Sequence, residues 1–219
     1  MSSIVPDWPV PGNVKAFFSD RFDGYSNAPY ASLNFGSHVG DDATAVARNR
    51  ATIDVPGEPF WLEQTHSDIC INADMDLAGR LGDASFTRKP GKVLAIMVAD
   101  CLPVLFASRG GDVAGIAHAG WRGLADGVLS STVAALGEGS MLAWMGPAIG
   151  PCHYTVGEDV RARFSSGTGF TENRFTENNE RKFSMDLYAI AKEQLQSLDV
   201  DVYGGGLCTY CDSSRFFSY

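Results

Sequence analysis

The stretch VLAIMVADCLPVLFAS, residues 93–108, places a carboxylate and a thiol in the middle of an otherwise apolar run. Apolar segments of this length are typical of buried strands, and they are far shorter than the roughly 20 residues that a membrane-spanning helix needs. The pattern predicts a buried strand that ends at Asp100 and Cys101, followed by a second strand that returns into the sheet. Polar residues that interrupt the apolar pattern of a buried strand in this way are expected where the chain builds a functional site.

Hydrophobic periodicity and turn signals place the other elements. Strands are expected at residues 15–20, 59–67, 68–72, 93–99, 104–107, 112–119, 141–145 and 201–206, and helices at 43–53, 124–136, 157–166 and 185–198. An Asp cap at Asp41 or Asp42 is expected for the first helix. Residues 24–42 and 167–180 read as loops, the second as a mobile surface loop. Because strands and helices are mixed and hairpins are expected, the pattern favours one α+β domain over residues 1–219.

Composition excludes several classes of protein. The chain has 17 basic and 26 acidic side chains, a net charge of −9, and no basic block, so nucleic acid and anionic membranes are poor partners. The N-terminal segment lacks the charged and apolar regions of a signal peptide. Five scattered cysteines suit reduced thiols in a cytoplasmic protein better than a disulfide framework. These features favour a cytoplasmic protein with small-molecule partners, as a monomer or weak homo-oligomer.

Histidine and cysteine residues point to a metal. The motifs G-x-S-x-G, G-x-x-x-x-G-K-[ST], G-x-G-x-x-G and H-E-x-x-H are all absent, and the chain has only 4 histidines. His66, Cys101 and His118 each stand where a predicted strand ends, so they can converge from separate strands. Two imidazoles and one thiolate suit zinc with an open fourth position. The alternative is a packed thiol and two histidines without metal.

Three other features have open alternatives. Asp100 can orient a ligand, relay a proton or bind a substrate hydroxyl, or it can accept hydrogen bonds from turn amides. Arg122 at a helix start can bind a phosphate or carboxylate, or it can lie on the surface against Trp121. Cys208-x-x-Cys211 can be half of a zinc site or a redox pair, and we favour two reduced thiols because no second C-x-x-C exists.

Several segments together resemble a known family. SLNFGSHVGDD, WLEQTHSD, ADCLPVLFAS, AGIAHAGWRGLADGVL, WMGPAIGPCHYTVGEDV, MDLYAIAKEQL and RFFSY occur in the order found in the bacterial laccase-domain family. That family has also been called polyphenol oxidase, purine nucleoside phosphorylase and peptidoglycan editing factor. The resemblance runs from about Phe17 to Tyr219. It departs at Ser67, where the family commonly has Gly, and members commonly continue past RFFSY with a basic tail.

The resemblance implies a layered α/β/β/α fold with mixed sheets, related to the catalytic domain of cytotoxic necrotizing toxins. It implies one zinc per chain on His66, Cys101 and His118, with copper as an older attribution. The implied activity is phosphorolysis of adenosine, inosine and S-methyl-5′-thioadenosine, with adenosine deamination as a side activity. Removal of a wrong amino acid from a muramyl precursor is also attributed to members.

Chemistry discriminates among these activities. A multicopper oxidase needs about ten histidine ligands and paired His-x-His segments, so 4 histidines without that pair disfavour it. Phosphorolysis needs groups that bind phosphate, stabilise the ribose and hydrogen-bond the leaving base. The candidate residues for substrate binding are Arg122 and Arg50 for phosphate, Asp100 or Asp83 for base or ribose, and Asn34.

Three hypotheses remain at this point. The first is a zinc-dependent purine nucleoside phosphorylase with deaminase activity, in which Cys101, His118 and His66 form the catalytic centre. The second is a cysteine or metal amidase acting on a muramyl peptide, with Cys101 as nucleophile and a histidine as its base. The third is a non-catalytic metal-binding module, which Cys152 or His153 as a fourth ligand would support.

Overall fold

The computed structural model describes residues 2–75, 79–165, 174–178 and 182–219. The helices are α1 (Ala43–Ala51), α2 (Trp121–Asp126), α3 (Val128–Leu136), α4 (Glu158–Ser165) and α5 (Leu187–Ser197). The strands are β1 (Ser3–Ile4), β2 (Phe18–Ser19), β3 (Pro59–Trp61), β4 (Cys70–Asn72), β5 (Ala84–Thr87), β6 (Val93–Ala95), β7 (Leu102–Ser108), β8 (Ala114–Ala119), β9 (Met141–Met145), β10 (Thr155–Val156), β11 (Phe175–Glu177), β12 (Phe183–Met185) and β13 (Val200–Gly204).

A six-stranded mixed sheet, in the order β13-β9-β7-β8-β5-β4, forms the centre of the molecule. β13 runs parallel to β9 and β4 runs parallel to β5, whereas the inner pairs are antiparallel. Smaller sheets are β3-β6, β10-β12-β11 and β1-β2. The mixed α+β class with mixed sheets is therefore confirmed, and the relation to the necrotizing toxins stays a prediction.

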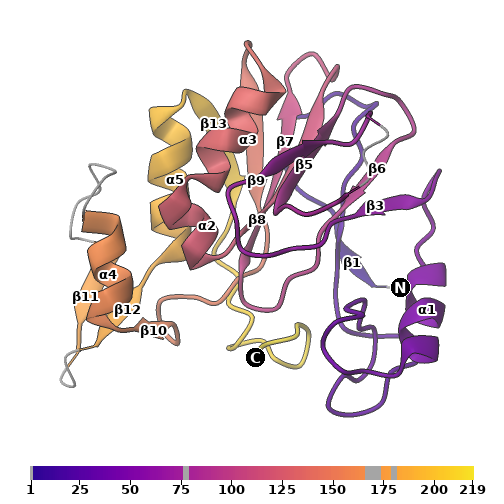
Figure 1. The fold of residues 1–219 in the computed structure, drawn as a ribbon, viewed down its shortest axis with the longest axis horizontal. Helices are drawn as coiled ribbons and strands as arrows, with labels where there is room; N and C mark the ends of the chain where they lie inside the picture. The colour runs from indigo at the N-terminus through magenta and orange to yellow at the C-terminus, as the bar shows by residue number, and fades with distance from the viewer. Residues whose placement is uncertain (1, 76–78, 166–173, 179–181) are drawn as a thin grey trace.

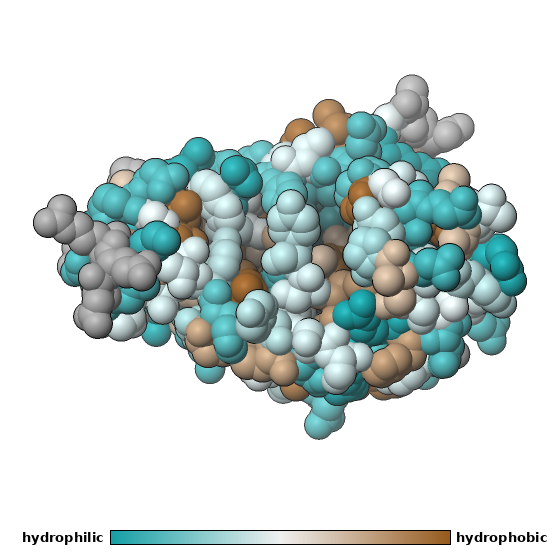
Figure 2. All heavy atoms as spheres, turned by 90° about the horizontal axis from the view of Figure 1, so that it is seen from below, coloured by the Kyte–Doolittle hydropathy of each residue, from teal (hydrophilic) through white to brown (hydrophobic). Residues whose placement is uncertain are grey.

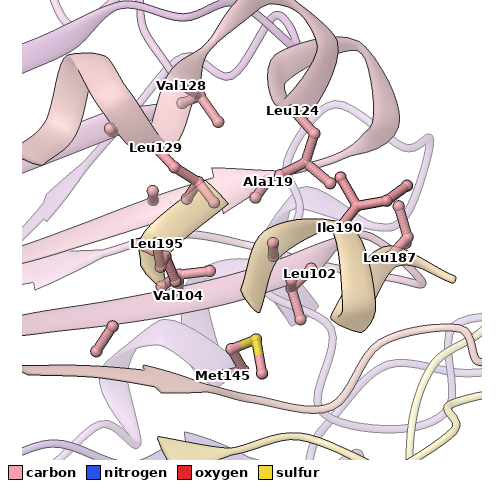
Figure 3. Packing of buried hydrophobic residues seen from close by; sticks show 14 of the residues in the cluster. Leu102, Val104, Ala119, Leu124, Val128, Leu129, Met145, Leu187, Ile190 and Leu195 are labelled. Atoms are coloured by element: carbon pink, nitrogen blue, oxygen red, sulfur yellow. The ribbon is translucent and has the colours of Figure 1, made fainter. Parts of the chain in front are cut away.

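The layers follow one another along the long axis of the molecule. Helices α2, α3 and α5 cover one face of the six-stranded sheet, β3 and β6 lie on its other side, and α1 lies beyond them (Figure 1). The main core fills the space between the sheet and its helices. Leu102 and Val104 of β7 lie beneath Ile190 and Leu195 of α5 (Figure 3). All four side chains are at least 99% buried, so this packing anchors β7 firmly.

Most predicted elements are present, but several expectations were wrong in detail. The strand expected at 59–67 stops at Trp61, and the strand expected at 15–20 covers only Phe18–Ser19. The helix expected at 124–136 begins at Trp121 and breaks at Gly127, whose φ of 99° needs glycine. The strand expected at 93–99 stops at Ala95, so Cys101 precedes β7 and does not end a strand. Within the loop expected at 167–180, Phe175–Glu177 form β11, and the rest except residues 174 and 178 lies outside the described residues.

Capping residues explain the helix starts that the sequence predicted. The side chain of Asp42 accepts a hydrogen bond from the backbone N–H of Ala45 at the start of α1. Asp186 accepts in the same way from Ala189 at the start of α5. Among the described residues, no helix combines the length and the hydropathy that a membrane span requires.

Candidate metal centre

The side chains of His66, Cys101 and His118 meet at one end of the six-stranded sheet. Their ligand atoms all lie within 4.8 Å of one another, and Sγ of Cys101 lies 3.9 Å from Nε2 of His66. The two imidazole rings face each other edge to face, with centroids 4.8 Å apart. The structure thus brings together the three residues that the sequence proposed as ligands.

Different elements hold the three side chains. Cys101 directly precedes β7, and His118 lies in β8, where Pro103 of β7 pairs with it. His66 lies in the turn before β4, with a φ of 62°. Such a left-handed conformation is uncommon for a residue with a side chain and persists only where its surroundings impose it.

Asp83 imposes the conformation of this turn. Its carboxylate accepts hydrogen bonds from three successive backbone N–H groups, those of residues 65, 66 and 67, at 3.0, 2.9 and 2.6 Å. Successive N–H groups that converge on one anion form a concave nest. The hydroxyl of Ser67 donates a further hydrogen bond at 2.8 Å, so the residue that departs from the family pattern strengthens this contact.

The same carboxylate orients His118. Oδ1 of Asp83 lies 2.8 Å from Nδ1 of His118, and both side chains are at least 95% buried. A histidine that donates its Nδ1 proton to a carboxylate presents Nε2 as the free ligand atom. The hydrogen bonds from His118 and Ser67 hold the pKa of Asp83 well below its usual range although burial opposes this. Asp83 therefore positions both histidines, a different use from the substrate contact that the sequence suggested.

Charge at the centre favours a thiolate. Burial alone would raise the pKa of the Cys101 thiol, but hydrogen bonds from His118 and His66 lower it to about 7. Burial alone would lower the pKa of His118, but its bonds to Asp83 and Cys101 raise it to about 9. At neutral pH the metal-free centre thus approaches a thiolate–imidazolium pair, and a metal ion that binds there displaces the proton.

Gly120 lies against the centre at the start of α2. A Cβ atom at this position would come within 2.8 Å of Sγ of Cys101 and 3.1 Å of Cδ2 of His66. Contacts that short do not occur without a shift of one partner, so the approach of β8 to the centre requires glycine. The sequence HAGWRG gives no local signal of this constraint.

The donor set suits zinc. Zinc takes imidazole nitrogen at about 2.0–2.1 Å and thiolate sulfur at about 2.3 Å, which places neighbouring tetrahedral ligands roughly 3.5 Å apart. The 3.9 Å between Cys101 and His66 is close to this spacing. Among the described residues, Cys152 and His153 do not join this group but belong to a separate one. Three protein ligands leave one position open, as in catalytic zinc sites.

Asp100 forms hydrogen bonds with the C-terminal segment of the chain. Its carboxylate accepts hydrogen bonds from the hydroxyl of Thr209 at 2.6 Å and from the backbone N–H of Tyr219 at 2.8 Å. Its backbone carbonyl accepts from the N–H of Ile149 at 2.9 Å. Asp100 thus fixes the C-terminal segment beside Cys101.

Two candidate substrate residues, Arg50 and Asn34, make contacts with the loop before α1. The guanidinium of Arg50 donates to the carbonyl of Phe35 at 3.0 and 2.8 Å and lies 4.4 Å from the centroid of the Trp61 ring. The side-chain amide of Asn34 donates to Asp41 at 2.9 Å. These contacts anchor the loop before α1. Arg122, four residues after His118, is therefore the remaining arginine candidate for phosphate.

Arg122 and Tyr154 complete the surroundings. The Arg122 guanidinium lies 4.5 Å from the centroid of the Trp121 ring. Burial and the charge of Cys101 raise the pKa of Tyr154 far above its usual range, whereas the charge of Arg122 opposes this rise. These interactions indicate that Tyr154 lies near Cys101 and Arg122. Tyr154 lies in the segment WMGPAIGPCHYTVGEDV, but the sequence alone did not single it out.

The surface at the C-terminal end of the molecule is mixed. In the view from below the ribbon of Figure 1, hydrophobic residues form small separate patches among hydrophilic ones (Figure 2). Among the described residues on this face, no broad continuous apolar area is visible.

Comparisons with known proteins find similarity over almost the whole chain. Residues 15–219 match the family model described as multi-copper polyphenol oxidoreductase laccase. The purine nucleoside phosphorylase YfiH of Escherichia coli is 42% identical, with 99% of this chain and 92% of that protein covered. The purine nucleoside phosphorylase PA4543 of Pseudomonas aeruginosa is 44% identical, with 99% and 91% covered.

Solved structures share the fold. Neisseria meningitidis protein NMB0706 superimposes with a TM-score of 0.93 at 42% identity, over 99% of this chain and 92% of that one. The Bacillus licheniformis protein YfiH superimposes with a TM-score of 0.85 at 31% identity, over 93% of this chain and 86% of that one. The mixed sheet and its helices are therefore common to this chain and these proteins.

Proposed function

The chain belongs to the family described as multi-copper polyphenol oxidoreductase laccase, and we propose that it is a zinc-dependent purine nucleoside phosphorylase. The observation that carries the proposal is the convergence of His66, Cys101 and His118 in a chain that resembles named purine nucleoside phosphorylases over 99% of its length. Adenosine, inosine and S-methyl-5′-thioadenosine are the proposed substrates, and adenosine deamination is a proposed side activity. A cytoplasmic location belongs to the same proposal.

The multi-copper part of the family description does not fit this chain. A trinuclear copper centre with a blue-copper site needs about ten histidines, and the chain has 4. Two of them, His66 and His118, are held by Asp83 at a centre that suits one ion. Zinc bound there would supply Lewis-acid chemistry to a substrate atom at the open position.

Residues of this chain can meet the remaining demands of phosphorolysis. In that reaction phosphate attacks C1′ of the ribose while the purine leaves and takes up a proton or hydrogen bond. Arg122 supplies positive charge for phosphate, and its guanidinium lies over the Trp121 ring. The Tyr154 phenol, like any tyrosine at neutral pH, keeps its proton, so it can donate a hydrogen bond to the leaving base.

Phosphate dependence tests the proposal. Purified enzyme with zinc is expected to release base from adenosine and to form ribose 1-phosphate only when phosphate is present, as measured by chromatography. Base release at the same rate without phosphate would contradict phosphorolysis. The Arg122→Met variant is expected to raise the KM for phosphate at least tenfold. Arg80→Met is its matched control, because Arg80 lies 4.5 Å from the centroid of the Phe60 ring, outside the metal centre.

A cysteine amidase is the second candidate, and the charge state of Cys101 favours it. A thiol with a pKa of about 7 beside a histidine with a pKa of about 9 resembles an activated nucleophile and its partner. Zinc ligation and nucleophilic attack both require the sulfur of Cys101, so the two mechanisms exclude each other. If chelation of the metal increases hydrolysis of a muramyl peptide and Cys101→Ser abolishes it, the amidase mechanism replaces the phosphorylase.

A further inference from the structure

A second group of ligand-type side chains lies apart from the first. Cys152, His153, Cys208 and Cys211 have ligand atoms that all lie within 4.8 Å of one another. Cys152 and His153 stand in the loop before β10, and the two other cysteines stand in the C-terminal segment after β13. The C-x-x-C pair, read from sequence as two reduced thiols, thus gains a third thiol and an imidazole from a distant part of the chain.

We propose that Cys152, His153, Cys208 and Cys211 form a structural zinc site that fastens the C-terminal segment to the loop before β10. Three thiolates and one imidazole make the closed four-ligand set of structural zinc, in contrast to the open set around Cys101.

The distances between the ligand atoms match a tetrahedron around zinc. Sγ of Cys152 lies 3.8 Å from Sγ of Cys208 and 3.5 Å from Sγ of Cys211. Nδ1 of His153 lies 3.2 and 3.4 Å from the sulfurs of Cys152 and Cys211. Tetrahedral zinc with bonds of about 2.3 Å to sulfur separates two sulfurs by roughly 3.8 Å and sulfur from nitrogen by roughly 3.5 Å. The four side chains therefore need little movement to take up the ion.

The backbone around the site supports thiolate ligands. The N–H groups of Gly150 and Cys211 donate to Sγ of Cys208 at 3.2 and 3.5 Å. Such outer hydrogen bonds stabilise a metal-bound thiolate and fix its direction. A Cβ atom on Gly150 would lie 3.2 Å from Cβ and 3.4 Å from Sγ of Cys208, so glycine lets the two loops approach this closely. The His153 ring is held by stacking on Tyr210, with centroids 4.2 Å apart.

Thr209 connects the second group of ligands to the first metal centre. This residue stands between the two cysteines of the C-x-x-C pair, and its hydroxyl donates to Asp100, the neighbour of Cys101. Its backbone N–H donates to the carbonyl of Ala148 at 3.0 Å. An ion bound at Cys208 and Cys211 would therefore hold the loop that packs against the residue preceding Cys101.

A disulfide is the competing use of these thiols. It would join two sulfurs at about 2.05 Å and would leave the third thiol and His153 without a role. The convergence of four ligand atoms favours the ion. Because the four residues lie outside the first centre, the site stands or falls independently of the proposed enzymatic activity.

Zinc content per chain tests the inference. Protein purified under reducing conditions with excess zinc and then dialysed is expected to carry two zinc ions, measured by mass spectrometry of the metal. Cys101→Ala is expected to retain one ion, and the double variant Cys152→Ser/Cys211→Ser is also expected to retain one. Cys70→Ser is the matched control and is expected to retain two, because Cys70 belongs to neither group. No zinc in the Cys101→Ala protein would overturn the proposal.

Two further measurements leave Cys152, His153, Cys208 and Cys211 unchanged, so they do not depend on whether a variant at these positions folds. Cobalt added to metal-free Cys101→Ala protein is expected to give strong sulfur-to-cobalt charge-transfer absorption, as three thiolate ligands require. In the unaltered protein, zinc is expected to protect Cys152, Cys208 and Cys211 from alkylation together, and a chelator is expected to expose them together. A Cys152–Cys211 or Cys208–Cys211 disulfide in freshly purified protein, detected by peptide mass, would contradict the zinc site.

Discussion

Oδ1 of Asp83 lies 2.8 Å from Nδ1 of His118, and the same carboxylate holds the backbone of His66. One buried acid therefore orients the imidazole of His118 and fixes the backbone that carries His66. Its position just before β5 fixes it to the antiparallel pair of β5 and β8, in which His118 lies. The metal centre thus depends on a residue that is not itself a ligand.

Asp83→Asn tests this dependence. The amide offers one acceptor oxygen in place of two and places N–H donors against the N–H groups of residues 65–67. We expect zinc affinity to fall 10- to 100-fold. We also expect the free energy of unfolding to fall by about 2–4 kcal/mol, because buried donors lose their partner. Competitive zinc titration and urea unfolding measure the two effects.

Asp74→Asn is the control for this change. Asp74 accepts hydrogen bonds from the Thr87 hydroxyl and from the Arg88 N–H at the other end of β5. Its variant is expected to lose stability without loss of zinc affinity. Equal zinc affinities for the two variants would show that Asp83 has no particular role at the centre.

Gly120→Ala is expected to disturb the centre directly. The new methyl group would lie 2.8 Å from Sγ of Cys101, so the sulfur has to move. The backbone φ of −66° suits alanine, so the change adds no backbone strain. Zinc affinity is expected to fall at least tenfold while the far-ultraviolet circular dichroism spectrum stays unchanged. Gly12→Ala, which would meet no atom within 4 Å, is expected to leave zinc affinity unaltered.

Sequence reasoning located the ligands but not what holds them. The three ligand types stand at recognisable turns, and the apolar run of β9 predicted Met141–Met145 to the residue. The sequence offered Asp83 only as a candidate to bind base or ribose, because its observed role needs a turn at residues 65–67 and a histidine in β8 to meet it in space. Such a contact between three distant segments leaves no periodic pattern in the chain.

The second group of ligands shows the same limit. Cys208-x-x-Cys211 is visible as a motif, whereas Cys152 lies 56 residues from Cys208 along the chain. The isolated bridge between Ala148 and Cys208 brings the two segments together. Local propensity also missed the break at Gly127, since residues 124–136 have a continuous helical pattern and only the left-handed φ at Gly127 divides it.

Cys101 and Cys70 are expected to differ in their reaction with iodoacetamide. In metal-free protein the rate at Cys101 is expected to rise with pH to half its maximum near pH 7, because that is the pKa of its thiol. Burial raises the pKa of Cys70 to about 11, against a hydrogen bond with Thr132, so Cys70 is expected to stay unmodified at pH 8. Peptide mass spectrometry after timed alkylation measures both rates. Zinc is expected to protect Cys101, and comparable rates at pH 8 would contradict the assigned charge states.

The raised pKa of Cys70 also predicts a loss of stability at high pH. Between about pH 9 and pH 11 the folded protein keeps a proton on this thiol that the unfolded chain releases. The free energy of unfolding therefore decreases as pH rises through this window. Cys70→Ala lacks the titrating group, so its stability is expected to fall less steeply between pH 9 and pH 11 in urea unfolding. Parallel pH profiles for the two proteins would count against this assignment.

Asp100→Gly and Asp199→Gly form a matched pair that separates backbone strain from side-chain bonding. Asp100 has a φ of 76° and Asp199 a φ of 56°, so glycine relieves the left-handed conformation at both positions. The side chain of Asp199 is exposed, and we expect its replacement to raise stability by about 0.5–1 kcal/mol.

At Asp100 the same relief is outweighed by the loss of the hydrogen bonds from Thr209 and Tyr219. We expect Asp100→Gly to lower stability by about 1–2 kcal/mol, because two charge-assisted bonds disappear. We also expect it to make the C-terminal segment cleavable by protease at least several times faster. Urea unfolding and timed proteolysis with mass analysis measure these effects. Asp100→Asn keeps an acceptor and tolerates the left-handed φ, so its values are expected to lie between those of Asp100→Gly and the unaltered protein. If Asp100→Gly were as stable as Asp199→Gly, Asp100 would not anchor the C-terminal segment.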